Sequence, residues 1–203
     1  MTSIVWDMGG TLFDTYPSID HAFADLLKEH GHDINLAEIS ALTRVSREHA
    51  IITLARRSGL LPSLFRGRYD EVKEGWKTTP PPLMAGALEV AQACKTSGGK
   101  NLVVTHRDRE SALQLLSTSE FVADDLISTS DGFPRKPDPA MIFEILSRNA
   151  VQASDCIAVG DRRIDVLAAN SAGIEAFLLV SASVPHNSDG TTITALTELL
   201  PYL

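Results

Sequence analysis

Polar residues follow the short apolar runs of this sequence, at the positions where those runs end. In chain order they are Asp7, Thr105, Lys136, Asp161 and Asp165. Carboxylates are hard oxygen ligands of the kind that Mg²⁺ prefers, and a carboxylate can also attack phosphorus as a nucleophile. A lysine ammonium and a threonine hydroxyl can stabilise a phosphoryl group during its transfer. An aspartate after a strand is commonly a turn residue or a helix cap, so the indication comes from all five residues together.

The apolar runs themselves predict a parallel sheet. Each run is short, aliphatic and closed by Gly, Asp or Thr, as buried strands are. Segments with helical spacing separate them, and strands that alternate with helices form a three-layer α/β structure with both sheet faces covered. Ligands of such sheets bind at the carboxyl ends of the strands, where the five polar residues would meet. We expect strands at 4–6, 101–105, 126–129, 156–159 and 176–180, and helices at about 85–95, 108–116, 139–149 and 163–172.

An all-helical segment is expected between the first strand and the second. Apolar residues recur at helical spacing in four stretches, and Gly31 would end the first helix. Asn35 with Glu38 has the pattern of a capping box ahead of the next helix. Three consecutive prolines at 80–82 then break the chain. We therefore predict a small helical cap domain at 15–79, inserted into a core formed by 1–14 and 80–203.

The composition limits the classes of protein to which the chain can belong. It has 203 residues, a formal net charge of −8, 44% hydrophobic and 22% charged residues, as ordinary globular proteins do. Residues 15–80 hold nine basic and nine acidic residues, whereas the remainder holds nine basic and 17 acidic ones. The excess of acid therefore belongs to the core, and it argues against a nucleic-acid partner, which needs a basic footprint.

Nothing in the sequence indicates a membrane or an oxidising compartment. No apolar run approaches the roughly 20 residues of a membrane span, and the first residues lack the pattern of a signal peptide. Cys94 and Cys156 have neither metal-ligand nor redox spacing and lie in apolar surroundings, so we expect buried, reduced thiols. These features favour a cytoplasmic protein without a membrane partner.

Four ordered motifs cover nearly the whole chain. The first runs from Asp7 to Asp14 (DMGGTLFD), and the second is Thr105 after its strand. The third, Arg135 to Pro139 (RKPDP), contains Lys136, and the fourth runs from Gly160 to Asp165 (GDRRID). With them the chain resembles a haloacid dehalogenase-superfamily hydrolase of the type with a helical cap after the first strand. The resemblance implies a Rossmann-like core, a Mg²⁺ cofactor and hydrolysis of a small phosphorylated metabolite.

The resemblance also implies roles for individual residues. Asp7 would be the nucleophile that forms an aspartyl phosphate, and the metal would bind Asp7, Asp161, Asp165 and the backbone carbonyl of Gly9. This agrees with the chemistry, because a cation must lie between a carboxylate and a phosphate dianion. Thr105 and Lys136 would contact the transferred phosphoryl group. Gly9 and Gly10 would let the backbone approach the phosphate closely, and His106 lies next to Thr105.

One position departs from the pattern of the family's phosphatases. They carry a second aspartate two residues after the nucleophile, as acid and base, and this chain has Gly9 there. A positioned acid or base contributes about 10²–10⁴-fold, so hydrolysis could be weak. His106 is a candidate replacement.

Gly9 also keeps alternatives open. The chain could be a catalytically weak phosphate- or partner-binding protein. A metal-free dehalogenase also lacks that aspartate, but it does not keep the acidic pair Asp161 and Asp165. A phosphonate-cleaving relative uses a cap lysine, and nothing selects among Lys28, Lys73 and Lys77. Substrate identity and oligomeric state stay open.

Overall fold

The computed structural model describes residues 1–180 and 190–203, and the chain divides into two compact units. The first, called the α/β unit here, comprises Met1–Phe13 and Leu83–Leu203. The second, called the helical unit, is Asp14–Pro82, where the sequence predicted 15–79. Residues 181–189 belong to the predicted core segment but lie outside the described residues.

A parallel sheet forms the centre of the α/β unit. The order of its strands is β3-β2-β1-β4-β5-β6, and every neighbouring pair is parallel. This is the Rossmann order, in which the chain starts in the middle and builds outward in both directions. The α/β, Rossmann-like expectation is therefore confirmed. The strands are β1 (Ser3–Trp6), β2 (Asn101–Val104), β3 (Asp125–Ile127), β4 (Cys156–Gly160), β5 (Glu175–Leu179) and β6 (Thr191–Ile193).

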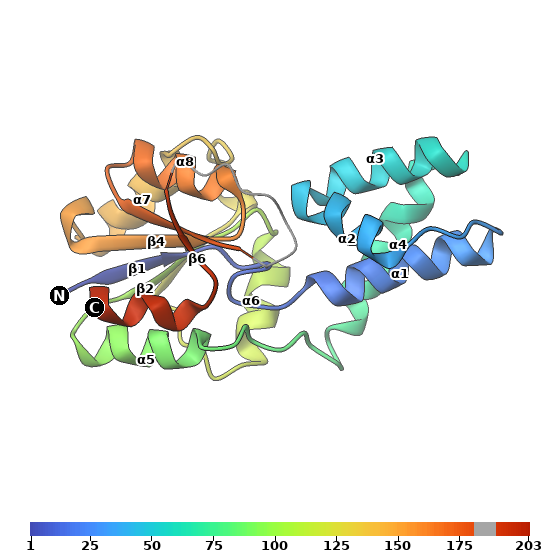
Figure 1. The fold of residues 1–203 in the computed structure, drawn as a ribbon. Coiled ribbons are helices and arrows are strands. Elements are labelled where there is room, and N and C mark those ends of the chain that lie inside the picture. The colour runs from blue at the N-terminus through green and yellow to red at the C-terminus, as the bar shows by residue number, and fades with distance from the viewer. Residues whose placement is uncertain (181–189) are drawn as a thin grey trace. The chain divides into compact units, whose positions relative to one another are not determined.

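Helices cover both faces of this sheet (Figure 1). Helices α7 (Ala140–Asn149) and α8 (Arg163–Ser171) pack on one face, where Val5, Val104 and Ala158 of the central strands join one apolar cluster with them. Helix α5 (Ala87–Thr96) lies on the other face, beside the C-terminal 3₁₀ segment η3 (Leu196–Tyr202). The remaining elements are α6 (Arg109–Ser117) and two 3₁₀ turns, η1 (Thr129–Asp131) and η2 (Ala153–Asp155).

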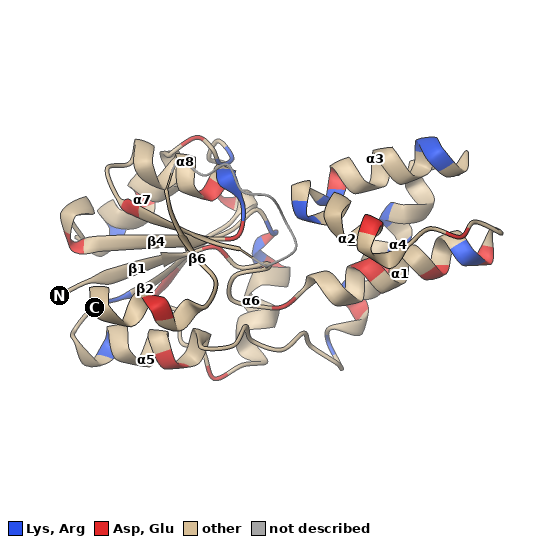
Figure 2. Ribbon diagram, viewed as in Figure 1, with Lys and Arg blue, Asp and Glu red and all other residues tan. Residues whose placement is uncertain are grey.

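The strands that meet at the centre of the sheet are uncharged. Neither β1, β2 nor β4 contains a charged residue, whereas β3 and β5 each begin with one, Asp125 and Glu175; the other charged residues of the described chain lie on helices and in loops (Figure 2). A strand covered on both faces has no solvent side that could keep a charge hydrated, so polar groups are confined to its ends. The sheet thus determines where chemistry can occur.

The helical unit consists of four helices around a core of its own. They are α1 (Tyr16–Glu29), α2 (Leu36–Val45), α3 (Arg47–Ser58) and α4 (Pro62–Gly75). The rings of Phe23 and Phe65 meet edge to face with centroids 5.4 Å apart, and both side chains are fully buried. Gly31 and Gly59 end α1 and α3 in the left-handed conformation that glycine adopts without strain.

Several local expectations needed correction. The Asn35 side chain caps α2 by accepting from the N–H of Ala37, and Glu38 instead forms an ion pair with Arg57 of α3, so the reciprocal capping box is absent. Pro139 precedes α7 and does not begin it, and the Asp138 carboxylate accepts from the N–H of Ala140. The edge strand β6 was not predicted.

Two further expectations concern the whole chain. Cys94 and Cys156 are free and buried, and burial raises the pKa of these thiols to about 11 and about 12, which keeps them protonated. Among the described residues, no helix combines the length and the apolar character that a membrane crossing requires.

Candidate active site

The candidate site lies at the carboxyl ends of the two central strands, β1 and β4. These strands are neighbours, paired from Ser3 with Cys156 to Trp6 with Val159, and the chain leaves them in opposite directions across the sheet. A crevice opens at such a reversal because the connections diverge. Asp7 follows β1 directly and Asp161 follows β4, so parallel pairing brings them to the same edge.

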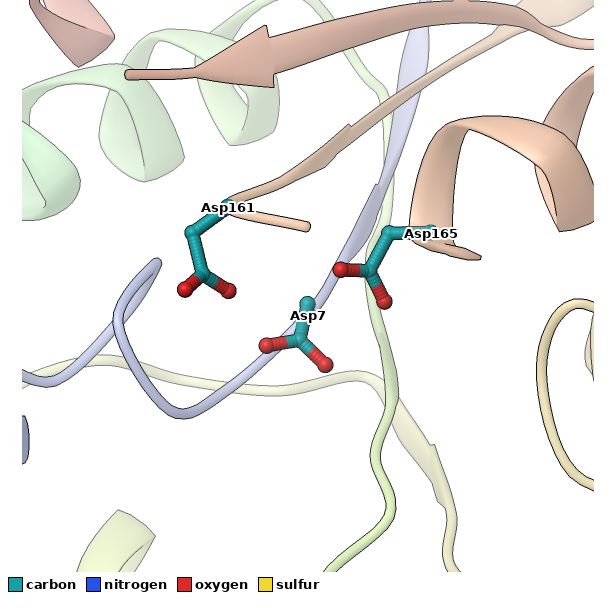
Figure 3. A group of neighbouring side chains, drawn as sticks. All are labelled: Asp7, Asp161 and Asp165. Atoms are coloured by element: carbon teal, nitrogen blue, oxygen red, sulfur yellow. The ribbon is translucent and has the colours of Figure 1, made fainter. Parts of the chain in front are cut away.

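Three carboxylates meet at this edge (Figure 3). Asp7, Asp161 and Asp165 each offer an oxygen, and these oxygens all lie within 4.8 Å of one another. Asp165 comes from the first turn of α8, and its carboxylate accepts the N–H of Arg162 at 3.1 Å. The hydroxyl of the fully buried Thr11 donates to Asp161 at 3.5 Å. The sequence-predicted acidic residues are therefore brought together.

Gly160 permits this convergence. A Cβ atom at position 160 would lie 2.3 Å from the Cβ of Asp165, which is far inside van der Waals contact. Any side chain there would displace Asp165 from the edge of the sheet. The glycine of the fourth motif is thus explained by space rather than by backbone conformation.

Lys136 lies at the centre of the buried charges. Its Nζ donates to Asp7 Oδ1 at 2.5 Å and to the carbonyl of Val104 at 3.0 Å, and it forms an ion pair with Asp165 Oδ1 at 2.5 Å. Two hydrogen bonds and one further ion pair thus surround the ammonium group. A flexible lysine is therefore held in one position, in contact with two of the carboxylates.

The charges in this cluster shift one another's pKa values. Burial raises the pKa of Asp7, and the neighbouring Asp165 adds to that effect against the attraction of Lys136. For Asp165 the cations Lys136 and Arg162 outweigh burial, so its pKa is lowered. Burial would lower the pKa of Lys136, but Asp165 and Asp7 together raise it. The ammonium ion therefore stays charged.

The donor set fits a hard divalent cation. Three carboxylates outnumber the two cations that act on them, Lys136 and Arg162, which leaves surplus negative charge in a desolvated place. Oxygen-only ligands at this spacing suit Mg²⁺ rather than a softer metal. These residues could hold Mg²⁺ at the strand ends.

Thr105 and His106 leave the sheet beside Asp7. Val103 of β2 pairs with Trp6 of β1, so the segments that follow these two parallel strands leave the sheet at the same edge. Thr105 is buried, and its Oγ1 accepts the N–H of Arg107 at 3.1 Å, which leaves the hydroxyl proton available to another acceptor. The Nε2 atom of His106 is buried without a hydrogen-bond partner.

The two predicted glycines shape the loop after Asp7. Gly10 has a φ of 86°, a region that favours glycine, and its N–H donates to the carbonyl of Phe13 at 2.8 Å. That N–H is therefore engaged inside the loop. Gly9 forms an isolated bridge with Phe13 and, like Gly10, holds the loop in its turn.

Two residues of the site were missed by sequence reasoning. Thr11 lies inside the first motif, but a threonine there gives no signal that its hydroxyl will reach Asp161 across the sheet edge. Arg162 reads as a solvated loop charge, yet it lowers the pKa of Asp165 and acts on Asp7 as well. Its position between two acidic residues is the signal that could have found it.

Comparisons with known proteins identify the family of the chain. The model of the haloacid dehalogenase-like hydrolases matches residues 4–179, which confirms the resemblance seen in the four motifs. The chain is 25% identical to a phosphoglycolate phosphatase of Rhodobacter capsulatus, over 85% of this chain and 81% of that one. It is 26% identical to a 6-phosphogluconate phosphatase of Escherichia coli, over 97% of this chain and 92% of that one.

A solved structure shares the fold. It is that of a hydrolase of the same family from Deinococcus radiodurans, with bound phosphate and sodium. The TM-score is 0.80 at 18% identity, with 98% of this chain and 93% of that chain covered. At that identity the likeness supports the fold alone.

Proposed function

The chain belongs to the haloacid dehalogenase-like hydrolases, and from that premise we propose that it is a Mg²⁺-dependent phosphatase acting through an aspartyl phosphate at Asp7. Its substrate is a small phosphorylated metabolite, the class on which the named relatives act. The observation that carries the proposal is the convergence of Asp7, Asp161 and Asp165 around a fully buried Lys136.

In this proposal Asp7 attacks phosphorus and the leaving oxygen departs from the opposite side. Thr105 donates its hydroxyl proton to a phosphoryl oxygen, and Lys136 neutralises charge on the transferred group and on Asp7. His106 lies at the same edge as a further phosphate contact, and the loop at Gly9 and Gly10 lets the substrate come close. Asp161 and Asp165 hold the metal with Asp7 and the Gly9 carbonyl. Bound Mg²⁺ supplies the positive charge that lets a phosphate dianion approach the Asp7 carboxylate.

The same cluster favours phosphoryl transfer over dehalogenation. A metal-free attack by Asp7 on carbon would gain nothing from two further carboxylates nearby, and Asp165 adds to the burial that raises the pKa of the nucleophile. Their presence is understandable where a divalent cation is bound.

The test is turnover of p-nitrophenyl phosphate with Mg²⁺. Asp7→Asn removes the nucleophile with little change in shape, and we expect at least about a 10³-fold loss of rate. Asp161→Asn and Asp165→Asn should raise the Mg²⁺ concentration needed for half-maximal rate. Asp70→Asn, at an exposed position of the helical unit, is the matched control and should leave the rate unchanged. Equal rates for Asp7→Asn and the parent protein would refute the proposal.

A second candidate function follows from Gly9, which leaves the nucleophile loop without a second carboxylate. In that case the chain is a phosphate- or partner-binding protein with little turnover. Beryllofluoride with Mg²⁺ would then stabilise the fold while a broad screen of phosphate esters stays silent. Gly9→Asp would in that case raise turnover, by up to about 10²–10⁴-fold.

A further inference from the structure

His106 carries an unpartnered polar atom at the edge of the sheet where Asp7 ends its strand. Its Nε2 is buried and makes no hydrogen bond, which is costly unless a ligand or a reacting group completes it. The charged groups that face it come from two other elements: Arg135 and Lys136 from the segment before α7, and Arg162 and Asp165 from the start of α8. The imidazole therefore borders the charge cluster of the proposed phosphatase site.

Most other polar side chains described at this edge already have a partner; Arg162 Nε and Asp165 Oδ1 are also buried without a hydrogen bond, but Asp165 Oδ1 is ion-paired with Lys136. Lys136 donates to Asp7 and to the carbonyl of Val104 and is ion-paired with Asp165. Thr105 accepts the N–H of Arg107, and Asp161 accepts the hydroxyl of Thr11. Gly9 contributes no side chain. Of the two buried nitrogens described here without a hydrogen bond, His106 Nε2 and Arg162 Nε, only the imidazole nitrogen can accept a proton, because a guanidinium group is a donor only.

Resting on the proposed function, we propose that His106 is the base that activates water against the phosphorylated Asp7. The water oxygen attacks phosphorus and its proton passes to Nε2. The bond from phosphorus to the Asp7 oxygen breaks, and the electron pair returns to the carboxylate. Inorganic phosphate departs, and the imidazolium ion releases its proton to solvent.

The protonation state of the free protein agrees with this role. Burial lowers the pKa of His106 to about 4, and Lys136, Arg162 and Arg135 act in the same direction against Asp165. At neutral pH the ring is uncharged, so it can accept a proton without first losing one. The pKa of this imidazole is therefore about that of an ordinary carboxyl group.

The same state limits the first chemical step. A neutral imidazole is no acid for the leaving oxygen when Asp7 is phosphorylated, so that oxygen must depart as a stable anion. The substrates favoured by this site are therefore phosphoanhydrides, acyl phosphates or aryl phosphates, rather than phosphate monoesters of simple alcohols.

The two steps can be separated with rapid-quench kinetics on p-nitrophenyl phosphate. His106→Gln should release about one equivalent of p-nitrophenol in a burst and then turn over about 10²–10⁴-fold more slowly than the parent. Acid quenching should trap phosphate on the protein during that slow phase. His21→Gln, an exposed histidine in the helical unit, is the matched control and should behave like the parent. His106→Asn should repeat the burst with a shorter side chain.

Two results would overturn the role of His106. One is a steady-state rate in His106→Gln within about threefold of the parent, and the other is a slow rate without burst or trapped phosphate. A leaving-group series on the parent protein tests the substrate class independently of any variant. We expect kcat/KM to fall steeply as the pKa of the leaving group rises, and a flat series would contradict it. If the parent and Asp7→Asn have the same rate, the proposed function itself fails.

Discussion

Lys136 in the α/β unit and Arg57 in the helical unit each form an ion pair with a carboxylate, in very different surroundings. The side chains of Lys136 and Asp7 are each 3% exposed, whereas those of Arg57 and Glu38 are 45% and 48% exposed. The helical unit has more such exposed pairs, including Arg66 with Glu48. Exposed ion pairs contribute little to the stability of the fold because water screens them. Buried charges lower that stability unless each one is paired with an opposite charge. Partly exposed pairs occur in the α/β unit too, for example Arg148 with Glu144, so the comparison separates one buried pair available for chemistry from the surface pairs that both units carry.

Lys136→Met should show the largest difference between the two units. It leaves Asp7 and Asp165 buried without their cation, and breaking such a pair costs about 3–5 kcal/mol of unfolding free energy. Arg57→Met removes the same kind of charge from a surface pair and should cost under about 1 kcal/mol. Urea unfolding of both variants without Mg²⁺ measures the difference. Similar losses would mean that the buried cluster is better hydrated than its contacts indicate.

Gly160→Ala should have the next largest effect. The added Cβ would meet Asp165 at 2.3 Å, so α8 or the carboxylate must shift. We expect a loss of about 1–3 kcal/mol, together with weaker Mg²⁺ binding measured by calorimetry. If the affinity for Mg²⁺ is unchanged, the position of Asp165 does not determine metal binding.

Acidification should destabilise the protein through His106. Its pKa is about 4 in the folded protein and about 6.5 in the unfolded chain, so between these values the unfolded chain binds more protons. Stability therefore falls as the pH decreases from about 6.5 to about 4. Because part of the ring meets solvent, we expect about 1–2 kcal/mol from this group.

Comparing His106→Gln with the parent isolates that contribution from the titration of the carboxylates. The difference in unfolding free energy between the two proteins should change across this pH range and stay constant above it. If the difference in unfolding free energy is the same at all pH values, the pKa of His106 is not lowered in the folded protein.

Gly67→Ala should have the smallest effect of the four, and the opposite sign. Gly67 lies inside α4, and a Cβ there meets nothing within 4 Å. Alanine is favoured over glycine in a helix interior, so we expect the free energy of unfolding, measured by thermal unfolding, to rise by about 0.5–1 kcal/mol. A loss would indicate that this helix face contacts another surface.

The predictable part of the molecule is the part that short-range rules determine. Strands covered on both faces must be short and apolar, and polar residues must then stand at their ends, so Asp7, Thr105 and Asp161 could be assigned to one edge of the sheet. Gly31 and Gly59 marked helix ends for a similarly local reason.

The sequence-based predictions that were wrong or missing concern residues whose partners are distant in the sequence. Glu38 matched a capping pattern, but Arg57 of another helix competes for its carboxylate. Arg162 acts on Asp7, which is distant in the sequence, and its place between Asp161 and Asp165 was the one local signal of that role. The strand β6 is short, and its first two residues are exposed, so its apolar pattern is too weak to read.

The junction between the two units has an architectural consequence. Phe13 forms an antiparallel bridge with Leu83, Leu12 accepts the N–H of Met84, and the N–H of Asp14 donates to the carbonyl of Pro82. The outgoing and returning segments are therefore hydrogen-bonded to each other, and everything between them is, for the sheet, one long loop. Since the entropy of closing a loop grows only slowly with its length, changes in the length of the inserted segment should have little effect on the stability of the sheet. The register of the strands that carry the chemistry would stay the same throughout such changes.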